Sequence, residues 1–293
     1  MYDTVIIGCG PAGMTAGIYL ARAGKKVIIL EKETIGGAMS TAPLIENYPG
    51  FEHITGNELA FDMYNQAQKA GVEIKIEEVE KIEPHKVISD SNEYETKTII
   101  LATGTKHRKL NIPNEEELIG KGIHFCASCD GPFYKDKTIA VLGGANSAVV
   151  NTIYLANICK KIYLIYRGDK LKCEKVLADK VQNLKNVEIL YNTNVVKING
   201  QDKLESIVIK GKTEKELKLD GMFEAIGTIP ETKIAKDVLS LTKDNYFQHN
   251  NTLTNLENVF VAGDCASKNV RQVATAVSDG ATAATFAINY LNK

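Results

Sequence analysis

Two cysteines near the middle of the chain have a spacing that suits redox chemistry. Cys126 and Cys129 form the one C-x-x-C pair among six cysteines, and Asp130 follows them directly. Thiol–disulfide exchange requires a thiolate, so a carboxyl that moves protons is expected beside such a pair. Zinc binding is the alternative use of the pair, but the second C-x-x-C that would complete a zinc site is absent. Without the cysteines before it, Asp130 would read as a turn residue preceding Gly131.

The other four cysteines lie at no motif spacing. They are Cys9, Cys159, Cys173 and Cys265. A free cysteine packs as a small hydrophobe, so we expect all four to be structural. The sequence leaves the role of Cys265 open, because this residue directly follows Asp264, a candidate cofactor ligand.

A glycine motif near the N-terminus predicts a dinucleotide site. The β-branched run from Thr4 to Ile7 reads as a strand, and Gly8, Gly10 and Gly13 follow it as G-x-G-x-x-G before a helical pattern. The first glycine permits the tight turn, the second lets a pyrophosphate approach the backbone, and the third lets helix and strand pack closely. The start of the helix then offers unpaired N–H groups and a positive dipole end to the phosphates.

Acidic residues at two strand ends refine the ligand. Glu31 closes the next predicted strand, where a carboxylate can bond a ribose hydroxyl, and an acid there favours FAD or NAD. Asp264 follows the last predicted strand, and Arg271 to Val273 open the last helix. This arrangement suits an aspartate on a ribityl hydroxyl and a helix N-terminus beside a flavin ring, which selects FAD. A simple helix N-cap is the alternative role for Asp264.

The strand–turn–helix–strand pattern occurs twice. The second copy begins with the strand Thr138 to Leu142, turns at Gly143 to Ala148, and continues through a helix to the strand Ile162 to Ile165. A β-meander is expected with strands at 188–191, 195–198 and 206–209, and a terminal helix is expected at 273–291. Both copies are βαβ units. The sequence therefore predicts an α/β fold with two Rossmann-like, three-layer dinucleotide-binding domains.

Length and composition exclude several classes of protein. The chain has 293 residues with 35 Lys and Arg against 36 Asp and Glu, a net charge of −1, whereas nucleic-acid binders carry a basic excess. A content of 44% hydrophobic and 24% charged residues argues against intrinsic disorder, and the length suits about two domains. The first residues do not resemble a signal peptide, and no apolar run reaches about 20 residues. We expect a cytoplasmic protein with no membrane or nucleic-acid partner.

Taken together, these motifs resemble those of the low-molecular-weight flavin thioredoxin reductases. The resemblance covers essentially the whole chain in the right order. It rests on GCGPAG at 8–13, ENYPG at 46–50, ATG at 102–104, CASCDG at 126–131, GDC at 263–265 and RQV at 271–273. The C-x-x-C-D sequence within these flavin motifs is highly specific.

The resemblance implies an FAD domain built from both chain ends, with a smaller domain inserted into it. We expect the FAD domain at 1–112 plus 243–293 and the inserted NAD(P)-like domain at 113–242, with movable linkers near 112–113 and 240–243. Cys126 and Cys129 would form a redox disulfide, in which Cys129 lies against the flavin and Cys126 attacks the disulfide of thioredoxin. Asp130 would manage the thiol protons. Thioredoxin is the implied substrate and a homodimer the implied assembly, and no metal is expected.

The FAD contacts implied by the family lie mostly at turns and strand ends. They are Gly8, Gly10, Pro11, Ala12, Gly13, Glu31, Gly37, Asn47, Val79, Thr103, Gly104, Asp264, Arg271, Gln272 and Val273. Together these residues are expected to hold FAD.

The second glycine turn departs from the pattern of the NADPH-dependent members. Ala145 places a methyl group where a pyrophosphate should approach the backbone. The family's His-Arg-Arg and later Arg read here as Tyr166, Arg167, Gly168 and Lys172, so most of the planar grip on a 2′-phosphate is missing. A related branch with the same architecture takes electrons from ferredoxin, and a degenerate nucleotide site is typical of that branch. We therefore expect reduced ferredoxin as the electron donor.

Three alternatives stay open. The protein could be an NADPH- or NADH-dependent thioredoxin reductase with an atypical nucleotide site, a flavin reductase of the ferredoxin–NADP⁺ type, or a flavin redox sensor without turnover. The flavin reductase has no reason to keep the C-x-x-C pair. The intact Cys126, Cys129 and Asp130 speak against the redox sensor.

Overall fold

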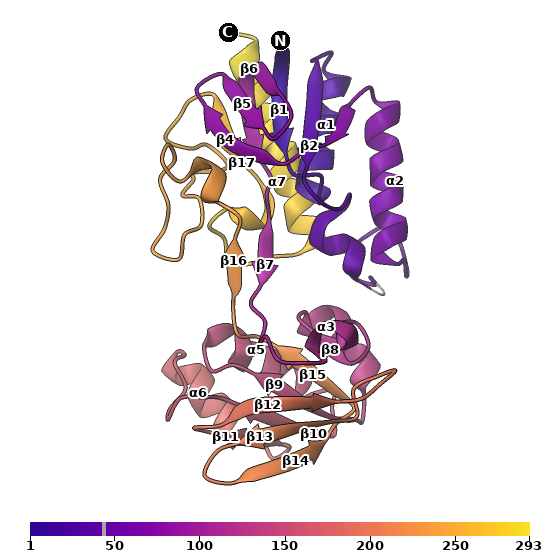
Figure 1. The fold of residues 1–293 in the computed structure, drawn as a ribbon, viewed down its shortest axis with the longest axis vertical. Helices are drawn as coiled ribbons and strands as arrows, with labels where there is room; N and C mark the ends of the chain where they lie inside the picture. The colour runs from indigo at the N-terminus through magenta and orange to yellow at the C-terminus, as the bar shows by residue number, and fades with distance from the viewer. Residues whose placement is uncertain (43–44) are drawn as a thin grey trace. The chain divides into compact units, whose positions relative to one another are not determined.

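The computed structural model describes residues 1–42 and 45–293 and consists of two compact α/β units (Figure 1). The first unit comprises Met1–Lys106 and Ile229–Lys293, and the second comprises His107–Thr228. Each unit has a parallel sheet with helices packed against it, which confirms the predicted fold class. Because both ends of the chain lie in the first unit, the second unit is an insertion.

The chain passes between the units at 106/107 and 228/229, whereas the sequence analysis placed the boundaries at 112/113 and 242/243. Leu110 and Ile112 pack against the core of the second unit. Ala235 is buried in the core of the first unit. Residues 107–112 and 229–242 therefore each belong to the unit opposite to the expected one. The strands β7 (Thr105–His107) and β16 (Thr228–Pro230) pair with each other at these two passages.

The first unit is built on a seven-stranded sheet in the order β3-β2-β1-β6-β5-β4, with β17 paired to β6. β1, β2, β3, β6 and β17 are parallel, while β4 and β5 form an antiparallel extension beside β6. The strands are β1 (Tyr2–Ile7), β2 (Val27–Glu31), β3 (Glu73–Ile76), β4 (Val79–Glu83), β5 (Lys86–Ser89), β6 (Glu93–Leu101) and β17 (Val259–Val261). Their continuous apolar runs suit a sheet that is covered on both faces.

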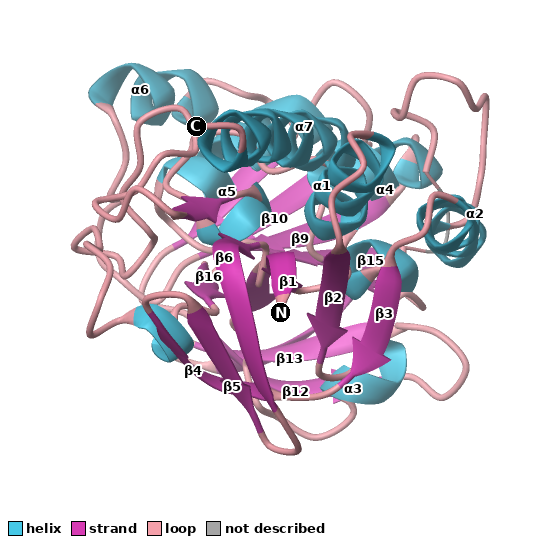
Figure 2. Ribbon diagram, turned by 90° about the horizontal axis from the view of Figure 1, so that it is seen from above, coloured by secondary structure: helices cyan, strands magenta, loops and turns pink. Residues whose placement is uncertain are grey.

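Three long helices cover one face of this sheet, and Figure 2 shows α1 and α7 side by side. Gly280 of α7 permits that closeness, because a Cβ there would lie 2.2 Å from the carbonyl oxygen of Ala12 on α1. The opposite face packs against β4, β5 and the segment 234–266. The helices are α1 (Pro11–Arg22), α2 (Gly56–Lys69) and α7 (Val273–Leu291), and the short 3₁₀ turns are η1 (Gly37–Thr41), η3 (Lys233–Ala235) and η4 (Gly263–Cys265).

Parallel register brings the carboxyl ends of four strands to one edge of the sheet. Ile7 on β1 pairs with Leu30 on β2 and with Leu101 on β6. Leu101 also pairs with Val261 on β17. The turns that follow these strands contain most of the residues predicted to hold the cofactor, so the topology gathers them at the edge where α/β sheets bind ligands.

The second unit has a five-stranded parallel sheet in the order β11-β10-β9-β15-β8. Helices α5 and α6 pack on one face and a three-stranded meander packs on the other. The sheet strands are β8 (Ile123–His124), β9 (Thr138–Leu142), β10 (Lys161–Ile165), β11 (Val187–Leu190) and β15 (Gly221–Glu224). The helices are α3 (Glu115–Leu118), α4 (Ala127–Asp130), η2 (Gly131–Tyr134), α5 (Asn146–Leu155) and α6 (Lys175–Gln182).

The meander differs from the predicted one. It consists of β12 (Asn194–Asn199), β13 (Ser206–Lys210) and β14 (Glu214–Lys218). The strand predicted at 188–191 is β11, which follows α6 and joins the parallel sheet. The sequence analysis missed β14 because its residues are exposed and charged apart from Leu217, so the apolar alternation is too weak to signal a strand.

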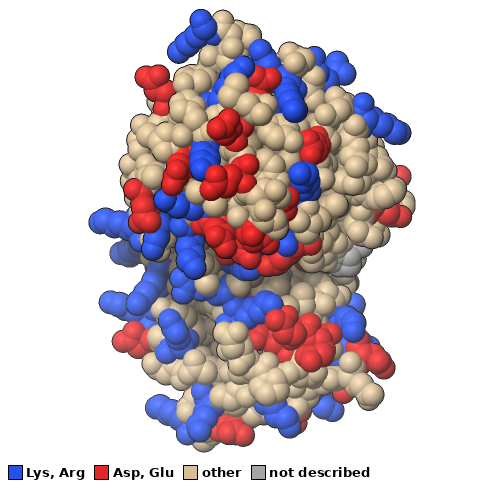
Figure 3. Space-filling model, turned by 45° about the horizontal axis from the view of Figure 1, so that its top comes forward, with Lys and Arg blue, Asp and Glu red and all other residues tan. Residues whose placement is uncertain are grey.

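The near-zero net charge of the chain conceals opposite charges in its two units. Residues 107–228 carry 19 Lys and Arg against 15 Asp and Glu, a formal charge of +4, which leaves −5 on the first unit. Both signs are present on the visible face of each unit (Figure 3). No helix in the described part of the chain has the length and apolar character that a bilayer span requires.

A pair of buried glutamates lies in the second unit. The carboxylate of Glu115 accepts backbone N–H groups from Leu110 at 2.8 Å and Asn111 at 2.7 Å. Glu224, at the end of β15, is 3% exposed, and its carboxyl oxygens accept no hydrogen bond from the described residues. Burial, and then the neighbouring charge of Glu115, raise the pKa of Glu224 to about 9 against the opposing charge of Lys109. Glu224 is therefore protonated at neutral pH.

We predict that Glu224 makes stability fall as pH rises. The pKa of Glu224 in the folded protein lies above its ordinary value of 4.5. The contribution of Glu224 to the free energy of unfolding is therefore full below about pH 4.5 and is lost as pH rises through about 9. Glu224→Gln cannot ionise, so it should gain stability relative to wild type between pH 5.5 and 8.5, by roughly 2–4 kcal/mol. Urea unfolding followed by circular dichroism at several pH values measures this difference.

Glu214→Gln, on an exposed strand of the same unit, is the matched control and should show no such trend. A difference between Glu224→Gln and wild type that stays constant with pH would show that Glu224 is already ionised in the folded protein.

Candidate redox and cofactor site

The turn between β1 and α1 has the backbone geometry that the glycine motif predicts. Gly8 adopts φ +104°, and a Cβ there would lie 2.3 Å from the carbonyl oxygen of Ala102. A Cβ on Gly13 would lie 1.9 Å from the carbonyl oxygen of Gly8. Gly10 precedes α1 and provides no side-chain cap, while Pro11 starts the helix without an N–H of its own. The first turn of α1 is therefore open to an anionic ligand.

Glu31 is held against this turn. One carboxylate oxygen accepts the backbone N–H of Cys9 at 2.7 Å, and the other accepts the N–H of Glu33 at 3.0 Å. The carboxylate is thus fixed at the carboxyl end of β2, beside the glycine turn that precedes α1. Cys9 itself is fully buried, and burial raises the pKa of its thiol to about 12, which leaves it unreactive.

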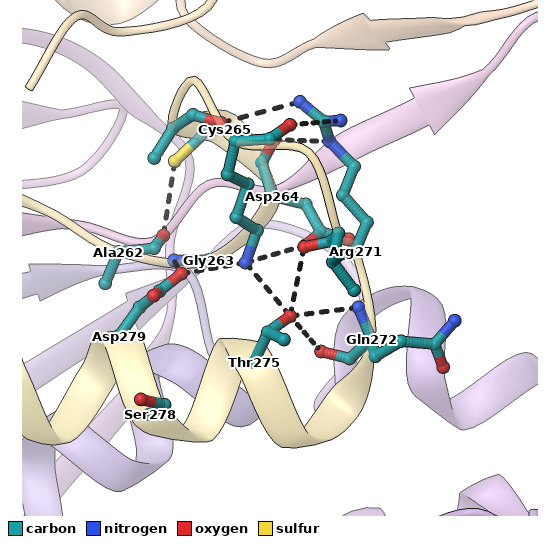
Figure 4. A network of polar contacts seen from close by, with 12 residues as sticks. Ala262, Gly263, Asp264, Cys265, Arg271, Gln272, Thr275, Ser278 and Asp279 are labelled. Atoms are coloured by element: carbon teal, nitrogen blue, oxygen red, sulfur yellow. Dashed lines mark hydrogen bonds and ion pairs between the residues drawn. The ribbon is translucent and has the colours of Figure 1, made fainter. Parts of the chain in front are cut away.

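A second polar cluster follows β17 (Figure 4). The carboxylate of Asp264 lies 3.3 Å from Lys268 Nζ, and that ammonium also lies 2.7 Å from the carboxylate of Asp279. Asp279 in turn accepts the backbone N–H of Gly263 at 3.1 Å. The buried Oδ1 atom of Asp264 is the oxygen that faces Lys268, in an ion pair whose geometry falls short of a hydrogen bond. Burial raises the pKa of Asp264, although the charge of Lys268 opposes this.

Arg271 is anchored on the same loop. Its guanidinium donates to the carbonyl oxygen of Lys268 at 3.0 Å and lies over the ring of Tyr246 at 4.3 Å. Gln272 precedes α7, and its side-chain oxygen accepts from Asn47 Nδ2 at 3.1 Å. Val273 is the first residue of the helix.

The remaining predicted contacts differ in what they can offer. Gly37 opens η1 close to Gly10, since a Cβ on Gly37 would lie 3.6 Å from the Cα of Gly10. Thr103 and Gly104 follow β6, where the Thr103 hydroxyl donates to the carbonyl oxygen of Glu231 at 2.6 Å. Val79 is buried in the core at the start of β4, so only its backbone can face a ligand.

These residues fit FAD. The glycine turn offers a backbone approach and an open helix start to a pyrophosphate, and Glu31 is positioned for a ribose. Asp264 supplies a buried oxygen that holds an ion pair with Lys268 and can still accept a hydrogen bond from a ribityl hydroxyl.

The structure places a disulfide between Cys126 and Cys129, with the two Cα atoms 5.3 Å apart. Both residues are half-buried, and the backbone N–H of Cys129 lies 3.2 Å from Cys126 Sγ. Asp130 is 7% exposed and ends α4, and its carboxylate lies 3.4 Å from Nδ1 of His124. The sequence analysis did not single out His124. The one signal in the sequence that could have indicated it is a histidine two positions before the C-x-x-C pair.

The second glycine turn is covered by its own chain. A Cβ on Gly144 would lie 2.4 Å from the ring of Tyr166, and a Cβ on Gly168 would lie 2.6 Å from the same ring. The backbone N–H of Lys172 donates to the carbonyl oxygen of Gly144 at 2.7 Å. The tyrosine ring and the following loop therefore occupy the surroundings of the turn.

The start of α5 is engaged in a further local contact. Ala145 precedes the helix and provides no side-chain cap. The Asn146 side chain accepts the backbone N–H of Glu174 at 2.9 Å and donates to its carboxylate at 3.2 Å. A carboxylate near a helix start is favourable for the helix, but it repels phosphates.

Comparison with known proteins places this geometry in context. A family model described as pyridine nucleotide-disulphide oxidoreductase matches residues 2–280. The chain is 41% identical to a "34.2 kDa protein in rubredoxin operon" of Clostridium pasteurianum, over 99% of this chain and 97% of the relative. It is 35% identical to the thioredoxin reductase of Bacillus subtilis, over 100% of this chain and 96% of the relative. The crystal structure of thioredoxin reductase from Streptococcus pyogenes MGAS5005 matches with a TM-score of 0.95 and 38% identity, over 100% of this chain and 98% of that chain.

The sequence similarity extends over the whole chain, and the fold and the C-x-x-C disulfide agree with it. FAD is the cofactor, and the protein is a flavin disulfide oxidoreductase. The chain belongs to the thioredoxin reductase family of pyridine nucleotide-disulphide oxidoreductases.

Proposed function

We propose that the protein reduces a thioredoxin through the Cys126–Cys129 pair and receives its electrons from reduced ferredoxin or a similar one-electron protein. The single observation that carries the choice of donor is the second glycine turn, where the ring of Tyr166 packs against Gly144 and Gly168. A dinucleotide would have to displace the chain's own contacts at that turn. Bound FAD supplies the ability to collect electrons and pass two of them to a disulfide.

The charges around this turn also disfavour NADPH. Arg167 and Lys172 are exposed, but Gly168 stands between them and contributes no side chain. The carboxylate of Glu174 is bonded to Asn146 at the helix start where a pyrophosphate would bind. An arginine can hold a phosphate with two parallel hydrogen bonds. Its replacement by Gly168 therefore weakens recognition of a 2′-phosphate by more than the loss of one positive charge.

Ferredoxin has enough driving force for the reaction. A plant-type ferredoxin near about −400 mV and a thioredoxin near about −270 mV differ by roughly 130 mV, on the order of 6 kcal/mol for two electrons.

The residues of the second unit have separate roles in this proposal. Cys126 attacks the thioredoxin disulfide, Cys129 exchanges electrons with FAD, and Asp130 transfers a proton to or from the reacting sulfur. In the first unit, Gly8 to Gly13, Glu31, Asp264 and the start of α7 hold FAD. The cytoplasmic location and the homodimer remain predictions.

The donor can be identified by anaerobic titration of the oxidised holoenzyme with reduced ferredoxin and, separately, with NADPH. We expect ferredoxin to bleach the FAD absorbance and to generate thioredoxin thiols at steady state. NADPH should do neither at a useful rate. Rapid bleaching by NADPH with thioredoxin turnover would overturn the choice of donor, whereas bleaching by either donor without thioredoxin thiols would indicate a redox sensor.

Replacing Tyr166 tests whether its ring, packed against the second glycine turn, decides the electron donor. Gly168 cannot accept a side chain while Tyr166 is present, so the variant combines Ala145→Gly, Tyr166→His and Gly168→Arg. We expect this variant to gain NADPH-driven flavin reduction by roughly tenfold or more, because it restores backbone access and a guanidinium. Tyr163→Phe, on β10 of the same unit, is the control. A variant that retains FAD yet gains no reduction by NADPH would show that the turn does not decide the donor.

The roles of the two cysteines are distinguished by trapping a mixed disulfide. Cys129→Ser leaves Cys126 free to attack, so it should accumulate a covalent complex with oxidised thioredoxin on a non-reducing gel. Cys126→Ser should not accumulate one. Cys173→Ser, which removes a free half-buried thiol of the same unit, should leave thioredoxin turnover unchanged. A stable complex formed through Cys129 in the Cys126→Ser protein would reverse the assigned roles.

A further inference from the structure

A buried network of three polar side chains adjoins the disulfide. His124 lies on β8, two residues before Cys126, and is 6% exposed. Its Nδ1 lies 3.4 Å from the carboxylate of Asp130, and its Nε2 lies 2.7 Å from the hydroxyl of Tyr134. The imidazole therefore joins the segment before the disulfide to the two segments after it.

Aromatic packing fixes the imidazole in this place. Its ring meets the ring of Tyr134 edge-on with centroids 5.3 Å apart, and the ring of Phe223 lies 5.5 Å away. Phe223 pairs with His124 across β15 and β8, and it also meets Tyr134 edge-on. A ring held on these sides cannot swing away from Asp130 without disturbing the core.

The network can hold a proton in more than one place. Burial, and then the charge of Asp130, raise the pKa of Tyr134 to about 12, so its hydroxyl stays protonated and can donate to Nε2 or accept from it. The other titratable groups that act on Tyr134 are Asp220 and Cys159. Lys137 Nζ lies 5.2 Å from the centre of its ring. Asp130 is the one described carboxylate within ion-pair distance of His124.

We propose that His124 is a positioning residue for Asp130, and that the two side chains share the proton that passes to and from the reacting sulfur of the Cys126–Cys129 pair. This deepens the proposed function, because it assigns the proton store behind the acid that the exchange reaction uses. Before transfer, one proton lies between the Asp130 carboxyl and Nδ1, and a second, on Nε2, is donated to the Tyr134 hydroxyl. The shared proton leaves through Asp130 to the sulfur, and the imidazole keeps the Nε2 proton that Tyr134 accepts.

The balance of the exchange step defines what the network does. An external dithiol attacks the disulfide through one sulfur, the Cys126–Cys129 bond breaks, and a mixed disulfide forms. The displaced enzyme sulfur leaves with the bonding electron pair and takes the shared proton. The second thiol of the dithiol then displaces the other enzyme sulfur, so the dithiol is oxidised by two electrons and the enzyme pair is reduced by two. The two thiol protons of the dithiol replace those taken up, which restores the network.

The test uses dithiothreitol, whose reaction with the disulfide needs neither ferredoxin nor thioredoxin. Oxidised holoenzyme is mixed anaerobically with dithiothreitol between pH 5.5 and 9 and quenched with iodoacetamide, and alkylated Cys126 and Cys129 are counted by mass spectrometry. Dividing each variant's rate by the wild-type rate at the same pH cancels the ionisation of the reagent. His124→Gln should slow reduction at pH 7 on the order of tenfold to a hundredfold, and this ratio should change with pH.

Tyr134→Phe keeps the ring and removes only the hydroxyl, so it should show a smaller loss with a shifted pH dependence. It also keeps the proposal testable if His124→Gln folds poorly, as judged by FAD content and circular dichroism. The controls are His53→Gln, an exposed imidazole of the first unit, and Tyr163→Phe, a half-buried tyrosine on β10. Both should match wild type at every pH.

A ratio that stays constant with pH in His124→Gln and Tyr134→Phe would show a purely structural role and overturn the proposal, as would unchanged rates in both. Thioredoxin turnover is measured in parallel on the same samples. If dithiothreitol reduces the disulfide of both variants as fast as that of wild type, this inference fails. If the variants are slowed as expected but the wild-type protein produces no thioredoxin thiols, only the proposed function fails.

Discussion

The first unit depends on one constraint: at three glycines, backbones touch each other with no side chain between them. Gly8 lies against the end of β6, Gly13 against Gly8, and Gly280 against the backbone of Ala12. These contacts tie β1, β6, α1 and α7 together around one turn. A methyl group at any of them would overlap a carbonyl oxygen or the backbone beside it, so the strands could not keep both their register and their helix contacts. The residues predicted to hold FAD follow the strand ends that these contacts hold together.

The second unit keeps the same architecture and uses it differently. Its glycine turn also lies at the carboxyl edge of a parallel sheet, but an aromatic ring and a loop of the chain have taken the space around it. The ring of Tyr166 buries part of its apolar surface against the two glycines, which stabilises the turn without a ligand. The disulfide of this unit and the polar side chains beside it lie in the segment between β8 and η2.

The sequence predicted the features that depend on local pattern. Strong apolar runs located β1, β9, β10 and β17, and the terminal helix was predicted with its observed bounds. The strand β14 was missed because its residues are almost all exposed. The sequence did not show that residues 229–242 belong to the first unit, because this depends on the packing of Ala235 and Leu239 in the core of that unit.

The functional residues divide in the same way. The spacing of Cys126, Cys129 and the glycines of the first turn was enough to identify them from the sequence. His124 and Lys268 belong to no motif, and the sequence marked Tyr166 only as a departure from one. The contacts of all three were not visible in the sequence. Lys268 joins Asp264 to Asp279 across a loop and a helix, and Tyr166 matters because two glycines lie under its ring.

The divided first unit has a consequence for how the protein is made. β17 and α7, which complete its sheet and cover α1, are synthesised after the whole inserted unit. At about 5–20 residues per second, residues 1–106 wait several seconds or more with the α7-facing side of α1 uncovered, while the contiguous insertion can already fold as a unit. The segment 107–228 with the disulfide is thus synthesised before β17 and the start of α7, so the residues predicted to hold FAD are complete only after these later segments have emerged.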